Sequence, residues 1–184
     1  MDKIEFRQYM NGLSYDKYYQ DIEYIDFIGY ANSWKSWENI KDLVDWRGKS
    51  VIDVGCFHGY YCFKAEKAGA INVIGIDKNE ETLKVTRLLA SLMNSKCTFI
   101  NITANDILPD TDILLCLNMF HYIPDQEAFL KTIKAQLVIF EIDKEDLPKI
   151  EKYYCIITKI DSHRPSFYTQ DRPNRWVLLA KKND

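Results

Sequence analysis

Residues 51–77 read VIDVGCFHGYYCFKAEKAGAINVIGID and contain the best-spaced glycines and acids of the chain. Residues 51–54 form a short apolar, β-branched run interrupted only by Asp53. Such a run is typical of a strand buried on both faces of a parallel sheet. Gly55 and Gly59 follow at once, and glycine there permits a positive φ or a close approach of the backbone to a ligand. The stretch therefore predicts a strand followed by a glycine turn.

A helix and a second strand follow this turn. Residues 60–68 place apolar side chains on one helical face, and Gly69 is positioned to end the helix. Residues 72–76 form a second buried strand, which delivers Asp77 at its carboxyl end. The segment is thus a βαβ unit with a glycine turn after the first strand and an acid after the second.

The rest of the chain continues the alternation. Further strands are predicted over residues 97–100, 112–117, 137–142, 154–160 and 175–180, and helical patterns cover residues 34–44 and 79–94 and begin after Asp125 and near Asp143. No helix separates the last two strands, which therefore pair antiparallel. The sequence predicts an α/β fold with a three-layer, doubly wound, Rossmann-like sheet of seven strands, mostly parallel with one antiparallel strand, preceded by a helical N-terminal segment.

The N-terminal residues 1–46 are rich in large aromatic side chains, which need other groups to pack against. Two interpretations are open: a helical lid over a ligand pocket, or a cover for an exposed face or edge of the sheet. A length of 184 residues fits one domain. We therefore expect a single domain over residues 1–184, with 1–46 as the lid or cover and 48–182 as the core.

The composition is that of a soluble globular protein, with 47% apolar and 28% charged residues and a formal net charge of −3. A surface built mainly for phosphate backbones is not expected, although a local basic patch is compatible with this average. The five cysteines, at positions 56, 62, 97, 116 and 155, form no C-x-x-C pair and no zinc-ligand cluster. We interpret them as small buried hydrophobic residues and expect no metal site.

The N-terminus lacks the residue order of a signal peptide, and no apolar run approaches the ~20 residues of a membrane span. The expected compartment is reducing, hence the cytoplasm, and no membrane partner is expected.

Candidate chemistry lies in four loops, because ligands of doubly wound sheets bind at the carboxyl ends of the strands. These loops comprise residues 55–59, 77–78, 105–107 and 118–122. A dinucleotide site would need glycines where Gly55, Phe57 and Tyr60 stand, so two of three positions fail. Asp53, just ahead of the turn, suits an ammonium group and would repel a pyrophosphate. The pattern favours an ammonium-bearing nucleoside.

Several motifs together resemble one family. D-V-G-C-F-H-G at 53–59, G-I-D at 75–77, N-D-I at 105–107 and N-M-F-H at 118–121 are similar to the motifs of class I S-adenosylmethionine-dependent methyltransferases. The resemblance covers roughly residues 48–182 and implies S-adenosylmethionine as the cofactor. The cofactor-binding residues it implies are Asp53, Gly55, Cys56, Phe57, Gly59, Asp77, Lys78, Asp106, Ile107 and Asn118.

The resemblance also implies a role for individual residues. Asp53 would reach the cofactor's ammonium group directly or through water, and Asp77 would accept hydrogen bonds from the ribose hydroxyls. Asp106 would accept from the adenine amino group while Ile107 offers its backbone amide. Asn118 would lie beside the methionine part.

Phe57 is a departure, because the family commonly has glycine at this position. Its ring must cover part of the cofactor, or the loop must run differently. The sequence of residues 53–70 also resembles that of a subgroup that includes wobble-uridine tRNA carboxymethyl-type transferases. This chain lacks the length for their additional substrate-binding parts.

The acceptor side is less defined. His121 follows the fourth strand and is the candidate general base for an acceptor that loses a proton, although the family often has a non-catalytic histidine there. Tyr122, His163 and Arg164 are candidate substrate-binding residues; the arginines of loop 161–174 either grip a carboxylate or phosphate or are solvated. His58 is expected to line the cofactor loop or to face solvent.

The favoured function is methyl transfer to oxygen or nitrogen of a small molecule. The asparagine-proline-proline-aromatic motif of amino methyltransferases is absent, which disfavours an adenine or glutamine acceptor. Two alternatives remain: a tRNA-modifying methyltransferase, and a non-catalytic S-adenosylmethionine-binding module or partner subunit.

Overall fold

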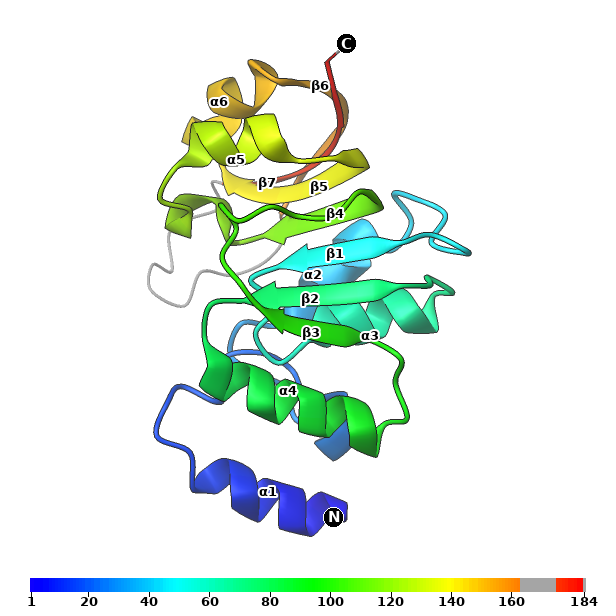
Figure 1. Ribbon diagram of the computed structural model, residues 1–184, viewed down its shortest axis with the longest axis vertical. Helices are drawn as coiled ribbons and strands as arrows, with labels where there is room; N and C mark the ends of the chain where they lie inside the picture. The colour runs from blue at the N-terminus through cyan, green and yellow to red at the C-terminus, as the bar shows by residue number, and fades with distance from the viewer. Residues whose placement is uncertain (163–174, 184) are drawn as a thin grey trace.

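A seven-stranded sheet with the order β3-β2-β1-β4-β5-β7-β6 forms the centre of the computed structural model, which describes residues 1–162 and 175–183 (Figure 1). The strands are β1 (Val51–Val54), β2 (Val73–Asp77), β3 (Thr98–Asn101), β4 (Thr111–Leu117), β5 (Ala135–Asp143), β6 (Tyr154–Asp161) and β7 (Arg175–Lys182). Strand β7 pairs antiparallel with both β5 and β6, and the other pairings are parallel. The predicted sheet, with one antiparallel strand near its edge, is confirmed.

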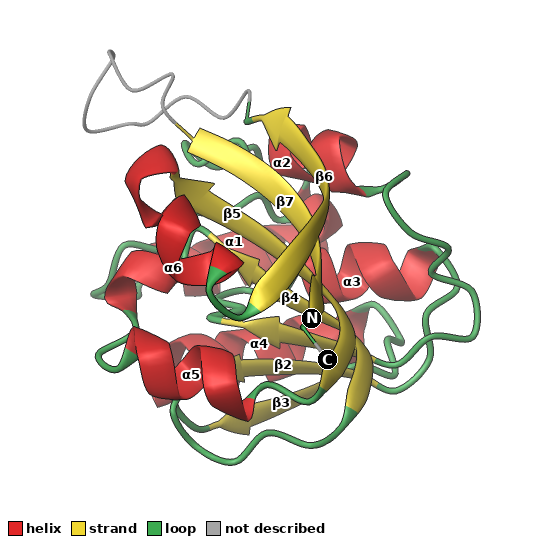
Figure 2. Ribbon diagram, turned by 90° about the horizontal axis from the view of Figure 1, so that it is seen from above, coloured by secondary structure: helices red, strands yellow, loops and turns green. Residues whose placement is uncertain are grey.

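Helices cover both faces of this sheet. They are α1 (Lys3–Asn11), α2 (Ser33–Ile40), α3 (Tyr60–Lys67), α4 (Glu80–Leu92), α5 (Gln126–Thr132) and α6 (Leu147–Glu151), with 3-10 turns η1 (Glu23–Ile25), η2 (Phe120–Tyr122) and η3 (Lys144–Asp146). Figure 2 shows α5 and α6 on one side of the sheet and α2 and α3 on the other. Two separate clusters of buried apolar side chains correspond to these two faces. The predicted three-layer architecture is therefore confirmed.

The predicted helical N-terminal segment includes helix α1, which begins with a capping box formed by Asp2 and Glu5. Two local predictions need correction. Helix α2 ends at Ile40 rather than at residue 44. All five cysteines are free, but Cys155 is exposed on the edge strand β6, where alternate side chains point away from the core, so it is not a buried hydrophobic residue.

The N-terminal segment packs into the same core cluster as α3 and α4. The buried apolar side chains that the N-terminal segment contributes to this cluster are Phe6, Met10, Ile22, Ile25, Trp37, Ile40 and Trp46. Polar bonds add to this packing: the side chain of Gln20 accepts the Tyr60 N–H at the start of α3 (3.2 Å), and Asp21 accepts the N–H groups of Gly29 and Trp34 (both 2.7 Å). The segment is thus packed against α3 and α4, while its function as a lid or a cover stays a prediction.

Gly29 allows two parts of this segment to lie in direct backbone contact. A Cβ atom added to Gly29 would lie 2.5 Å from the carbonyl carbon of Gln20 and 2.6 Å from its oxygen. Backbone atoms cannot rotate away, so we expect Gly29→Ala to displace residues 19–21 and to lower the free energy of unfolding by about 2–3 kcal/mol. Urea denaturation measures the loss, and tryptic cleavage after Lys17 should become faster.

Gly12→Ala is the matched control for this experiment. Gly12 has a helical φ of −76°, and the nearest atom to an added Cβ is the Tyr9 oxygen at 3.4 Å. Gly12→Ala should leave stability and cleavage nearly unchanged. Equal behaviour of the two variants would show that the close backbone contact at Gly29 is unimportant.

Candidate functional site

The glycine turn after β1 folds back over the end of β2. Gly55, Phe57 and Gly59 have φ values of 73°, 51° and 77°. The N–H groups of Gly55 and Cys56 both donate to the Ile76 carbonyl, at 2.8 and 2.9 Å. Glycine tolerates these φ values, whereas Phe57 adopts a conformation that is uncommon for a side chain of its size. The turn is therefore tightly held and includes one strained residue.

Asp77 joins this turn to the start of α4. Its Oδ2 accepts the Phe57 N–H at 3.1 Å, and its Oδ1 accepts the Asn79 N–H at 2.9 Å. The side chain is half-buried, and a carboxylate has further lone pairs for ligand hydroxyls. The structure thus places Asp77 against the glycine turn, where it can both shape the turn and bind a ligand.

Asp53 is a buried carboxyl group with little protein compensation. It is 1% exposed, and its hydrogen bond comes from a thiol, Cys62 Sγ, at 3.6 Å. Burial raises the pKa of Asp53 from 3.8 to about 7; the Cys62 bond opposes this shift, and the negative charge of Asp77 adds to it. A cationic group would compensate this carboxylate, so Asp53, as an acceptor, fits the ammonium group of S-adenosylmethionine.

Asn118 directly follows β4, has a φ of 57° and forms bonds at both ends of its amide. Its Nδ2 donates to the Tyr19 hydroxyl at 2.7 Å, and its Oδ1 accepts from the Arg175 guanidinium. Arg175 is 7% exposed, and its Nε lies 3.2 Å from Asp143 Oδ1 in an ion pair. Residues from β4, β5, β7 and the N-terminal segment therefore meet beside Asn118.

Two N-terminal tyrosines reach the glycine turn. The rings of Tyr15 and Tyr19 lie edge-on to Phe57, with centroids 6.2 and 5.5 Å away. The Tyr15 hydroxyl is 2.9 Å from His58 Nε2. Sequence reasoning did not assign these tyrosines to the site; the only signal was the aromatic richness of residues 1–46.

His58 does not face solvent. It is 1% exposed, and burial lowers the pKa of its imidazole to about 3, so the ring is neutral. Of the two alternatives stated above, only a position within the cofactor loop is compatible with this burial. Its partner is Tyr15 from the N-terminal segment.

Met119, which follows Asn118 in the candidate loop 118–122, lies against Gly55. A Cβ atom added to Gly55 would be 2.7 Å from Met119 Cε. Glycine at position 55 thus leaves room for this side chain, and the flexible thioether borders the expected methionine end of the cofactor site. Met119 belongs to the N-M-F-H motif at 118–121, but the motif gave it no role of its own.

Other expected site residues lie at the same edge of the sheet but face outward. The Asp106 carboxylate accepts the N–H and hydroxyl of Thr103 (2.6 and 2.9 Å), and these bonds lower its pKa. Ile107 is 91% exposed, and Lys78 is also exposed. Their roles towards adenine and ribose remain predictions.

The acceptor candidates are only partly described. His121 and Tyr122 are exposed on η2, with ring centroids 4.0 Å apart. His163 and Arg164 lie outside the described residues. The base and substrate-binding roles therefore stay predictions. Across residues 1–162 and 175–183, no three His, Cys, Asp or Glu side chains group so that they could hold a metal ion.

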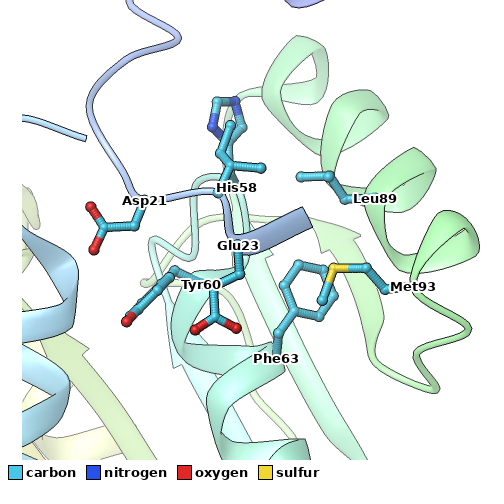
Figure 3. A pocket seen from close by; sticks show the side chains of 8 residues that line it. Asp21, Glu23, His58, Tyr60, Phe63, Leu89 and Met93 are labelled. Atoms are coloured by element: carbon cyan, nitrogen blue, oxygen red, sulfur yellow. The ribbon is translucent and has the colours of Figure 1, made fainter. Parts of the chain in front are cut away.

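A small hollow lies between the N-terminal segment, α3 and α4 (Figure 3). Its lining residues are Asp21, Ile22, Glu23, His58, Tyr60, Phe63, Leu89 and Met93. Its volume of about 10 Å³ is that of a single water site. It contains none of the expected cofactor-binding residues and is not a candidate for the nucleoside.

The fold is that of a doubly wound α/β protein, in which the ends of β1, β2 and β4 form the edge where a ligand is expected. The chain belongs to the methyltransferase domain family, which matches residues 46–160. The resemblance noted in the sequence is confirmed at the level of this family.

Curated relatives match part of the chain. It is 31% identical over 102 residues to tRNA U34 carboxymethyltransferase from Campylobacter hominis, covering 53% of this chain and 35% of that protein. It is 34% identical over 92 residues to ubiquinone biosynthesis O-methyltransferase from Vibrio campbellii, covering 48% of this chain and 39% of that protein. The matched part thus spans little more than a third of these relatives.

Two solved structures show the same fold. A putative S-adenosylmethionine-dependent methyltransferase from Listeria monocytogenes has a TM-score of 0.68 at 18% identity, covering 83% of this chain and 100% of that chain. Magnesium protoporphyrin IX methyltransferase from Synechocystis PCC 6803, with bound SAM, has a TM-score of 0.67 at 17% identity and covers 100% and 98%. At these identities the likeness concerns the fold alone.

Proposed function

We propose that this chain is an S-adenosylmethionine-dependent methyltransferase acting on oxygen or nitrogen of a small molecule. The observation that carries the proposal is the glycine turn, which is bonded to Asp77 and backed by the undercompensated Asp53 carboxyl group. A cationic amino-acid end and a ribose match these two carboxyl groups. Family membership over residues 46–160 supports the same conclusion.

The residues of the chain would bind and position the cofactor. Asp53 would hold the ammonium group, Asp77 the ribose hydroxyls, and Asn118 would border the methionine part. When bound, the cofactor supplies an activated methyl group, so positioning and water exclusion are the main tasks of the protein. An acceptor that loses a proton needs a base, and His121, on η2 just after Asn118, remains the candidate.

The first choice of acceptor class rests on net charge and on one relative. The formal net charge of −3 favours a small acceptor over a nucleic acid, and the Vibrio campbellii relative is named an O-methyltransferase of ubiquinone biosynthesis. A tRNA acceptor is the second candidate, because the Campylobacter hominis relative is a tRNA U34 carboxymethyltransferase.

Location and domain organisation complete the proposal. The five free cysteines support a reducing compartment, which we take to be the cytoplasm. In the described part of the chain, no helix is both long and apolar enough to cross a membrane. We further propose that residues 1–46 and 48–182 act as one domain, with the N-terminal part covering the core.

Titration calorimetry with S-adenosylmethionine and S-adenosylhomocysteine tests the cofactor assignment. We expect both to bind with micromolar dissociation constants and adenosine, which lacks the amino-acid end, to bind at least tenfold more weakly. If neither S-adenosylmethionine nor S-adenosylhomocysteine bound, the proposal would be wrong.

Methyl-labelled S-adenosylmethionine then distinguishes the acceptor classes. Label should enter the small-molecule fraction of a cell extract and not purified total tRNA. Salt-sensitive label transfer to tRNA would favour the second candidate. Cofactor binding without any transfer would favour the non-catalytic module.

A further inference from the structure

Tyr19 bridges the two loops that border the expected methionine end of the cofactor site. Its ring lies edge-on to Phe57 in the glycine turn, with a centroid distance of 5.5 Å and an interplanar angle of 79°. Its hydroxyl lies 2.7 Å from Asn118 Nδ2 at the end of β4. Since β1 and β4 are neighbours in the sheet, one side chain spans both strand ends.

The direction of the Asn118 amide is set by its other partner. Arginine has donors only, so the amide end that bonds Arg175 must be the carbonyl oxygen. The NH2 group then faces Tyr19, whose phenol oxygen accepts the bond. Arg175 is itself held by the ion pair with Asp143 on the adjacent strand β5. Tyr19 thus completes a chain of bonds that fixes Asn118 from both sides.

The Tyr19 hydroxyl is not needed to hold its own segment in place. The neighbouring Gln20 side chain bonds the Tyr60 N–H, and Asp21 bonds Gly29 and Trp34. Removing the hydroxyl should therefore leave the fold intact and free one end of the Asn118 amide.

The contact also accounts for Phe57, the residue that departs from the family's glycine. Its φ of 51° lies in the left-handed region, which is strained for a non-glycine residue. Its ring is the surface on which Tyr15 and Tyr19 rest. Glycine at this position would relieve the strain but remove that support.

We propose that Tyr19 is a positioning residue of the cofactor site, which acts by fixing the Asn118 amide. This rests on the proposed function, since Asn118 is assigned to the cofactor's methionine part. Residue 19 lies outside the part that matches the family, 46–160. The N-terminal segment therefore contributes to the site as well as covering the core.

The test compares Tyr19→Phe with Tyr18→Phe, the same change one residue away. Tyr18 donates its hydroxyl to Asn11 on the surface and its ring contacts Phe27, so it lies apart from the site. Stopped-flow displacement of S-adenosylhomocysteine gives the rate constants. Tyr19→Phe should raise the dissociation rate constant five- to tenfold, with the association rate constant and the melting temperature nearly unchanged. Tyr18→Phe should match the wild type.

A double-mutant cycle with Asn118→Ala decides whether Tyr19 acts through Asn118. In the Asn118→Ala background, Tyr19→Phe should change the dissociation rate constant less than twofold. Equal rates for Tyr19→Phe and Tyr18→Phe would overturn the proposal. If Tyr19→Phe raised the dissociation rate constant as much in the Asn118→Ala background as in the wild type, the proposal would also be overturned. Equal increases in the association and dissociation rate constants would overturn it too, because they would show that Tyr19 only controls access to the site. If the wild type binds neither S-adenosylmethionine nor S-adenosylhomocysteine, the proposed function itself fails.

Discussion

Asp53→Asn should weaken S-adenosylmethionine binding about 30-fold at pH 8 and remove most of its pH dependence. The Asp53 carboxyl group is buried, and burial raises its pKa to about 7. It must lose its proton to pair with an ammonium group, so wild-type affinity should rise by up to tenfold per pH unit below pH 7 and level off above it. Loss of a charge-assisted hydrogen bond accounts for the decrease at pH 8.

Calorimetry can follow the proton directly. At pH 6 the wild type should release close to one proton on binding, measured as a dependence of the heat on the ionisation enthalpy of the buffer. Above about pH 8 the ligand's own amino group begins to deprotonate, so affinity should fall again. In Asp53→Asn the affinity should not rise with pH below pH 7. If this variant kept the wild-type dependence of affinity on pH, another group would bind the ammonium.

The same group should influence the stability of the protein without ligand. Its folded pKa lies above the ordinary value of 3.8, so the folded state retains a proton that the unfolded chain has lost. This contribution to stability is complete below about pH 4 and is lost as the pH rises to 7, at about 1.4 kcal/mol per unit. The difference between the wild type and Asp53→Asn in urea denaturation isolates it from other groups.

Asp112→Asn is a suitable control for Asp53. Its carboxylate accepts the N–H and hydroxyl of Ser50, both at 2.9 Å, and these bonds lower its pKa. It lies at the amino end of β4, the edge of the sheet opposite the site. This variant should retain the wild-type pH profile of binding.

Asp77→Ala should weaken S-adenosylmethionine binding roughly 100-fold. The expected ribose bonds are lost, and the Phe57 N–H, which donates to Asp77 at 3.1 Å, is left without its acceptor. The glycine turn should therefore loosen at the same time as the ligand contact disappears. Calorimetry measures the affinity, and denaturation should show a loss of about 1–2 kcal/mol from the orphaned N–H groups.

Asp112→Ala separates these two effects. It removes an acceptor from the Ser50 N–H, much as Asp77→Ala does from Phe57, but at the opposite edge of the sheet. It should lose similar stability and keep the wild-type affinity. If Asp77→Ala kept wild-type affinity as well, the assignment of the ribose to Asp77 would be wrong.

Much of the core could be predicted because its signals are local. The run 51–54, the glycines 55 and 59 and the acid at 77 each report on a few neighbouring residues, and parallel pairing then brings their loops to one edge. Strand ends differed from prediction by at most two residues. A helical N-terminal segment was predicted without bounds for α1, and the capping box of Asp2 and Glu5 marks where this helix begins.

What the sequence alone determined was the sheet, the glycine turn and the two carboxyl groups Asp53 and Asp77, because periodicity and turn chemistry act over short distances along the chain. Only the tertiary structure decided how the N-terminal segment meets the glycine turn and Asn118. The bond between Tyr19 and Asn118 joins residues 99 positions apart, and the bond between Tyr15 and His58 joins residues 43 positions apart. Such contacts follow from how whole elements pack, which no local pattern records.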